Sequence, residues 1–186
     1  MEDVLEVYHR TRDPLRPLVC LDETTKQLVG EVRTPIPAAH GRLEAFDSEY
    51  VRNGVGTLFM MVAPLEGWRE VRVTQQKTRV DYAHCLKWLA DEAFVQAKKI
   101  ILVHDNLNTH QPSSLYCAFA PGEAKRLMER FEFHYTPKHG SWLNIAEIEL
   151  SALTIQCLSR RIPAPWRFCQ HSSRFARPDL SFFLSQ

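Results

Sequence analysis

Three acidic residues stand where their carboxylates could share metal ions. Asp22 directly follows an apolar run at residues 18–21, and Asp105 closes a second run that begins at residue 100. Apolar runs of this kind are typical of central strands, and α/β folds place their chemistry in the crevice at the ends of such strands. If the two strands are neighbours, the aspartates come close enough to repel each other, and they then need a shared proton or a bound cation. Taken singly, each aspartate could equally cap a loop or the next helix.

The third acid, Glu147, lies in an apolar segment at residues 143–158 and shares a helical face with Asn144, Ser151 and Thr154. An acid on so apolar a helix needs a partner. Three converging carboxylates without a basic partner suit two Mg²⁺ ions held by oxygen ligands. Such a pair of ions activates water or a 3′-hydroxyl and stabilises the leaving oxygen of a phosphodiester. The acids therefore indicate metal-dependent phosphodiester chemistry.

The pattern along the chain predicts an α/β domain that positions these acids on a sheet flanked by helices. Because residues 143–158 are apolar nearly all round, we expect that helix to be packed on more than one side. Residues 30–53, rich in proline and charge, predict a long loop or edge hairpin. After a short helix at the start, the expected order is β-β-β-α-β-α-β-α, with strands at 18–21, 54–63, 70–75, 100–105 and 131–135 and helices at 78–94, 112–119 with 122–130, and 143–158.

The composition is that of a single globular domain with no strong charge bias. The chain has 186 residues, 45% of them apolar, and a formal net charge of +1, so no overall basic charge points to nucleic acid. The acidic, amphipathic first residues are not typical of a secretory signal, so we expect none, and no apolar run is long enough to cross a membrane. The five cysteines form no zinc-binding spacing, and Cys20, Cys85 and Cys157 are expected to be reduced core thiols. No glycine-rich loop follows either apolar strand, which disfavours a nucleotide-binding domain.

Three motifs in this order resemble the mariner-type DDE transposases of bacterial insertion sequences, over residues 1–163. Leu21-Asp22-Glu23-Thr24 resembles their first acidic motif, and Asp105-Asn106-Leu107-Asn108-Thr109-His110 resembles their D-N-x-x-x-H motif. Pro137 followed by Leu143-Asn144-Ile145-Ala146-Glu147 resembles their P…L-N-x-x-E motif. The resemblance implies an RNase H-like fold with a mixed five-stranded sheet flanked by helices.

The resemblance also implies an activity and roles for single residues. It implies that Asp22, Asp105 and Glu147 are catalytic and hold two Mg²⁺ or Mn²⁺ ions. It also implies that the protein cuts DNA at transposon ends and joins the freed 3′-hydroxyl to target DNA. It implies that Asn106, His110 and Asn144 either hold the metal-binding carboxylates in place or position the substrate. The local alternatives for these three are an Asx turn, a satisfied core imidazole and a helix cap, respectively.

The expected partner is DNA, both transposon ends and target, with a homodimer as a candidate assembly and no membrane. Lys138 and His139, just before the helix of Glu147, are the expected contacts to the phosphate backbone. Trp142 is expected to stack on a base or sugar, with burial at the loop–helix junction as the alternative. The other basic pairs are expected to be solvated surface. The expected location is the bacterial cytoplasm, in association with the nucleoid.

The sequence departs from the family pattern in two ways. The 41 residues between Asp105 and Glu147 exceed the spacing common in the wider superfamily, so Glu149 is an alternative third acid. It lies about 160° away round a helix, so both glutamates cannot face the metals. We also expect this chain to lack the N-terminal helix-turn-helix of full-length relatives, and we expect its tail not to continue the family's final helices.

These departures predict a truncated copy. We expect residues 1–16 to be the end of a linker helix, 17–163 the catalytic domain and 164–186 an irregular tail that a frameshift would explain. Two alternatives to an active transposase domain stay open. One is a catalytically silent remnant that binds DNA or a partner, and the other is a non-transposing RNase H-like nuclease.

Overall fold

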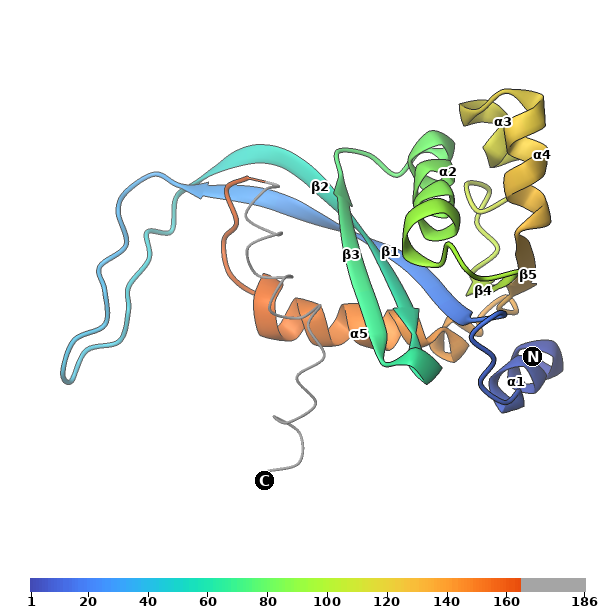
Figure 1. Cartoon of the computed structure of the whole chain (residues 1–186). Helices are drawn as coiled ribbons and strands as arrows, with labels where there is room; N and C mark the ends of the chain where they lie inside the picture. The colour runs from blue at the N-terminus through green and yellow to red at the C-terminus, as the bar shows by residue number, and fades with distance from the viewer. Residues whose placement is uncertain (165–186) are drawn as a thin grey trace.

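The computed structural model describes residues 1–164, which form a mixed five-stranded sheet with helices on both faces (Figure 1). The strand order is β3-β2-β1-β4-β5, and the strands are β1 Leu18–Glu31, β2 Tyr50–Ala63, β3 Trp68–Thr74, β4 Ile100–His104 and β5 Phe131–Tyr135. β1 pairs antiparallel with β2 and parallel with β4, so β1 and β4 are neighbours, as the predicted carboxylate pair requires.

The helices follow the predicted order and divide between the two faces of the sheet. They are α1 Glu2–His9, α2 Arg79–Trp88, α3 Ser114–Ala118, α4 Pro121–Glu129 and α5 Ile145–Leu153. The short turns are η1 Pro64–Glu66, η2 Leu89–Ala93, η3 Ser141–Leu143 and η4 Thr154–Leu158, and η2 and η4 continue α2 and α5 as π-helical turns. None of the described helices is long and apolar enough to cross a membrane.

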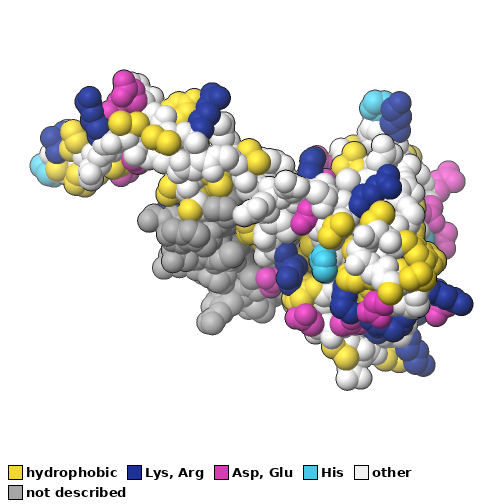
Figure 2. Space-filling view, turned by 90° about the horizontal axis from the view of Figure 1, so that it is seen from above, with side chains coloured by type: hydrophobic (Ala, Val, Ile, Leu, Met, Phe, Trp, Pro, Cys, Tyr) yellow, Lys and Arg dark blue, Asp and Glu magenta, His cyan; other side chains and the backbone are white. Residues whose placement is uncertain are grey.

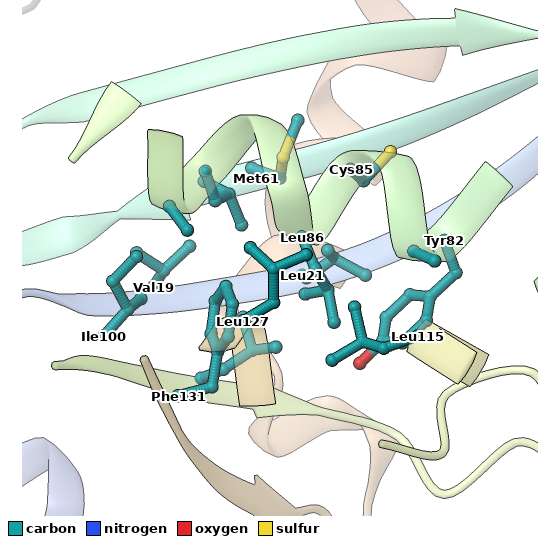
Figure 3. Packing of buried hydrophobic residues seen from close by; sticks show 14 of the residues in the cluster. Val19, Leu21, Met61, Tyr82, Cys85, Leu86, Ile100, Leu115, Leu127 and Phe131 are labelled. Carbon is teal, nitrogen blue, oxygen red and sulfur yellow. The ribbon is translucent and has the colours of Figure 1, made fainter. Parts of the chain in front are cut away.

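Alternation along β1 sends its side chains into two separate cores. Val19 and Leu21 pack under α2, α3 and α4, in the cluster that Figure 3 shows. Leu18, Cys20 and Leu28 pack on the opposite face, against α1 and α5. Because side chains alternate in a strand, the even-numbered residues between Cys20 and Leu28 face α5, and the odd-numbered residues face away from it.

The first two strands are much longer than the sequence predicted. β1 continues ten residues past Leu21 to Glu31, and β2 begins at Tyr50, so the expected end of the first strand was wrong. Residues 32–49 connect β1 and β2 as a projecting arm, and this confirms the hairpin alternative. The arm carries both basic and apolar side chains (Figure 2). β1 keeps its ladder with β2 beyond Leu21 through the backbone, which needs no apolar side chains.

Helix α5 is packed on one side, which corrects the expectation of packing all round. Leu150 and Leu153 are buried against the sheet, whereas Ile148 and Ile155 are 61% and 71% exposed. The second apolar stripe of this segment therefore faces outward, because α5 lies over the sheet with no further described element on its outer side.

The described cysteines are all free. Cys20 and Cys85 are buried, as expected of core thiols, whereas Cys157 is half-buried and Cys117 is exposed. Cys169 and the predicted irregular tail beyond residue 164 lie outside the described residues.

A half-buried acid, Glu132, ties the N-terminal segment to the edge of the sheet and predicts acid sensitivity. Glu132 on β5 accepts a hydrogen bond from Arg10 at 2.7 Å and also pairs with Arg16 and with His134. The hydrogen bond from Arg10 lowers the pKa of Glu132 from 4.5 to about 2, with help from His134 and Arg16. Partial burial of the carboxylate opposes this effect in part. A depressed folded-state pKa means that this contribution to stability is present above pH 4.5 and lost as the pH falls toward 2.

We therefore expect Glu132→Gln to lower the free energy of unfolding by about 1–2 kcal/mol at pH 7, a figure already reduced for solvent screening. The difference from the parent chain, measured by urea unfolding at several pH values, should shrink below pH 4.5 and vanish near pH 2. A difference that persists at that pH would show that packing rather than charge carries the effect.

Candidate active site

The three predicted acids line one open hollow of about 420 Å³ on the α5 face of the sheet. Asp22 projects from β1, Asp105 follows the last residue of β4, and Glu147 lies in the first turn of α5. Two parallel strands and a helix N-terminus, widely separated in the chain, thus bring three carboxylates to the same place.

Asp22 is held in the hollow by the strand alternation. Its cross-strand partner on β2 is Met60, a residue of the α5-side core, so the two side chains share that face. One carboxylate oxygen of Asp22 accepts a hydrogen bond from the backbone N–H of Glu23 at 2.8 Å. Burial, with further contributions from Glu23, Asp105 and Glu147, raises the pKa of Asp22 to about 7. A nearby cation would relieve this accumulation of negative charge.

Asp105 is oriented by a buried histidine. Nδ1 of His110 lies at hydrogen-bond distance from Oδ1 of Asp105, and Nε2 of His110 lies 2.9 Å from Oε2 of Glu23 without being aligned as a hydrogen bond. Both the His110 and Glu23 side chains are almost fully enclosed, at 1% and 2% exposure. His110 therefore bridges one predicted metal ligand to a second, deeper carboxylate.

The charges of this bridge stabilise one another. Burial by itself opposes a charged His110, but its contacts with Asp105 and Glu23 outweigh that effect and raise the pKa of His110 to about 9. Burial also opposes ionisation of Asp105, but the hydrogen bond from His110 and its charge hold the pKa of Asp105 below its ordinary value. The geometry makes Asp105 an ionised carboxylate fixed through one oxygen.

Asn144 links the helix of Glu147 to the strand of Asp22. Its side-chain oxygen accepts a hydrogen bond from the backbone N–H of Ala146 at 3.2 Å and so caps α5. Its side-chain nitrogen donates to the carbonyl oxygen of Leu21 at 2.9 Å, and the residue is buried. The local alternative, a helix cap, is thus confirmed, and the predicted positioning role of the same side chain stays a prediction.

The structure separates the two candidate glutamates. Glu147 lines the hollow with both aspartates, whereas Glu149 points to β3 and accepts a hydrogen bond from Arg69 at 2.7 Å. The geometry therefore favours Glu147 as the third acid.

The donor set of the hollow fits divalent ions of the Mg²⁺ type. Within residues 1–164, no lysine or arginine forms an ion pair with Asp22, Asp105 or Glu147, although each of these carboxylates keeps an oxygen free of hydrogen bonds. Hard oxygen ligands with excess negative charge are what Mg²⁺ and Mn²⁺ prefer.

His104 and His110 lie close enough to Asp105 to form a second possible ligand group, with atoms within 4.8 Å of one another. Their nitrogens are already engaged. Those of His104 lie 2.7 Å from the Asp105 carbonyl oxygen and 3.3 Å from the Tyr82 hydroxyl, while those of His110 face Asp105 and Glu23. We therefore do not count these histidines among the metal ligands, because their ring nitrogens already face protein groups.

The predicted DNA-contacting residues are close in sequence to Ser141 and Asp105, which line the hollow. Lys138 and His139 are exposed on the turn before η3, and Trp142 is 64% exposed, which removes the alternative that it is buried. Asn106 is exposed on the loop after Asp105, where its side-chain oxygen accepts a hydrogen bond from Gln111 at 3.3 Å. These four residues lie at the surface, and their roles toward DNA stay predictions.

Glu23 is the site residue that the sequence analysis did not assign. It is part of the first motif, but its cross-strand partner Phe59 belongs to the core under α2. The side chain of Glu23 therefore lies on the opposite face of the sheet from that of Asp22. Strand alternation was the signal that could have found it, since a glutamate beside Val19 and Leu21 on the apolar face needs a buried partner.

Comparison with known proteins gives one family and a set of similar folds. The family model described as DDE superfamily endonuclease matches residues 17–165. No curated protein matches the chain by sequence.

Among solved structures, the Mos1 mariner paired-end complex with Mn is 17% identical, with a TM-score of 0.57 over 94% of this chain and 52% of that one. The Mos1 strand transfer complex is 15% identical, with a TM-score of 0.59 over 100% of this chain and 52% of that one. The Mos1 transposase paired-end complex with the left transposon end is 14% identical, with a TM-score of 0.61 and the same coverage as the first. The chain spans about half the length of these proteins, and the likeness confirms the predicted RNase H-like fold.

Proposed function

Since the chain belongs to the DDE superfamily of endonucleases, we propose that it is a transposase catalytic domain that cuts DNA strands and joins a freed 3′-hydroxyl to target DNA. The observation that carries this proposal is the convergence of Asp22, Asp105 and Glu147 on one hollow beside a surface with exposed Lys138, His139 and Trp142. The mariner complexes that share the fold contain transposon ends, and one was solved with Mn.

In the proposed reaction, Asp22, Asp105 and Glu147 would hold two Mg²⁺ or Mn²⁺ ions through the carboxylate oxygens that accept no hydrogen bond. The bound ions would supply the positive charge that activates water or a 3′-hydroxyl and stabilises the leaving oxygen. His110 holds Asp105 in its ionised form, and Asn144 fixes the start of α5 against Leu21 of β1. The protein thus sets the spacing between the carboxylates before any ligand arrives.

DNA is the proposed partner, with its backbone held by Lys138 and His139 and a base or sugar stacked on Trp142. The exposure of these side chains at the edge of the hollow supports the proposal, because phosphates and bases can reach them without rearrangement of the core.

The test is a nicking assay with the full chain. Supercoiled plasmid and a labelled duplex with a pre-formed nick are incubated with Mn²⁺ or Mg²⁺, with EDTA as the metal-free control. We expect nicking that requires the metal and that Asp105→Ala abolishes, with circular dichroism confirming that the variant is folded. If the parent chain shows no metal-dependent nicking, or if Asp105→Ala nicks equally well, the proposed function is wrong.

A further inference from the structure

A second hollow continues from the first along the same strand and helix, toward the projecting arm. It has a volume of about 340 Å³ and is lined by Lys26, Gln27, Val29, Tyr50, Ser159, Arg160 and Arg161. The first hollow is lined by β1 up to Thr24 and by η4 up to Ile155. The second is lined by β1 from Lys26 onward and by the residues that follow η4, from Ser159 onward. Figure 1 shows α5 and its continuation alongside β1 and β2 in the direction of the arm.

Lys26 belongs to the same face of β1 as Asp22. Thr24 between them pairs across the sheet with Leu58 of the α5-side core, and Leu28 beyond them belongs to that core. Asp22, Thr24 and Lys26 therefore form one row. Four residues of extended strand place the Cα atom of Lys26 about 13 Å from that of Asp22.

The two hollows differ in charge. Within the described part of the chain, the side chains of Lys26 and Arg160 form no ion pair and no hydrogen bond. Arg161 is different, since it pairs with Glu31 at 2.6 Å and donates to the carbonyl oxygen of Asp47 at 2.7 Å. Arg161 thus holds the base of the arm, while two cations on the same rim are left available.

We propose that this second hollow is a phosphate-binding track, in which Lys26 and Arg160 hold the backbone of the DNA strand whose scissile phosphate lies at Asp22, Asp105 and Glu147. The proposal rests on the proposed function. A DNA strand advances at least about 3.4 Å per nucleotide, so a span of about 13 Å places the contacted phosphate no more than about four nucleotides from the cleavage point. Unpaired cations at that distance from the acidic first hollow offset the repulsion between its carboxylates and the DNA backbone. Lys138, His139 and Trp142 would then contact the DNA at the opposite end of the first hollow.

The first experiment measures binding without metal. A labelled duplex with single-stranded arms is titrated with the full chain in EDTA over a range of salt concentrations, by fluorescence anisotropy. The variant is Lys26→Gln/Arg160→Gln. The matched control is Lys98→Gln/Lys99→Gln, which removes two exposed cations just before β4 that line neither hollow. We expect the slope of log affinity against log salt to fall by about 1.4 in the first variant, at about 0.7 per single-strand phosphate, and to be unchanged in the control.

The second experiment measures metal-dependent nicking while each arm of the substrate is shortened. We expect KM to rise several-fold in Lys26→Gln/Arg160→Gln with kcat retained. This difference in KM between variant and parent should disappear once the single-stranded arm that crosses the second hollow is too short to reach it, at no more than about four nucleotides. If the parent chain nicks DNA but the two double variants behave alike, the track is wrong and the proposed function stands. If the parent chain does not nick DNA, the proposed function fails, and an unchanged salt slope in Lys26→Gln/Arg160→Gln then overturns the track as well.

Discussion

Glu147→Gln is expected to reduce metal-dependent DNA nicking by about 10³-fold, whereas Glu149→Gln two residues away should leave it within a few-fold of the parent rate. Loss of one ligand removes several kcal/mol of transition-state stabilisation, and each 1.36 kcal/mol corresponds to a factor of ten. Glu147 lines the hollow with the two aspartates, while Glu149 is engaged by Arg69 on β3. The measurement is the single-turnover nicking rate in Mn²⁺ at saturating protein.

The two variants carry the same chemical change on the same helix, so each controls for the other. Glu147 is exposed, and Gln in its place should leave the free energy of unfolding nearly unchanged. Glu149 forms a partly exposed ion pair, and its replacement should cost no more than about 1 kcal/mol. The reverse outcome, with Glu149→Gln inactive and Glu147→Gln active, would transfer the role of third acid to Glu149 and contradict the geometry.

The sequence was sufficient to predict the elements whose side chains enter the core. β5 begins and ends at the predicted residues, and β4 and the three acid-bearing positions also lie where the apolar runs indicated. The capping box of Thr78 and Asp81 at the start of α2 was likewise predictable, because both residues act through local hydrogen bonds.

What the sequence could not supply depends on tertiary contacts. The outer half of β1 is stabilised by its ladder with β2 and has few apolar residues, so hydrophobic periodicity ended the strand ten residues early. Helix geometry showed that Glu147 and Glu149 cannot share a face, but only the position of the sheet under α5 decides which one enters the hollow. Trp142 was undecided for the same reason, since its burial depends on what covers the turn.

The Glu23–His110 contact is expected to give the largest effect on stability. Glu23→Ala should lower the free energy of unfolding by about 3 kcal/mol, because removal of one partner from a buried ion pair leaves the other without compensation. We take the lower end of the usual range because His110 keeps its hydrogen bond to Asp105. Urea unfolding of Glu23→Ala, His110→Ala and the double variant, followed by circular dichroism, gives the coupling energy, which we expect to be about 2 kcal/mol.

Lys77 provides the internal control, because its ammonium lies 3.7 Å from the other oxygen of Glu23 but its side chain is 55% exposed. The coupling of Glu23 with Lys77 should therefore be below about 0.5 kcal/mol, and an equal coupling with both partners would contradict a buried pair. The same bridge orients Asp105, so Glu23→Gln, which keeps the shape of the side chain, should lower nicking and Mn²⁺ affinity by about 10–100-fold. A Glu23→Gln variant with parental Mn²⁺ affinity would show that this carboxylate stabilises the fold without positioning Asp105.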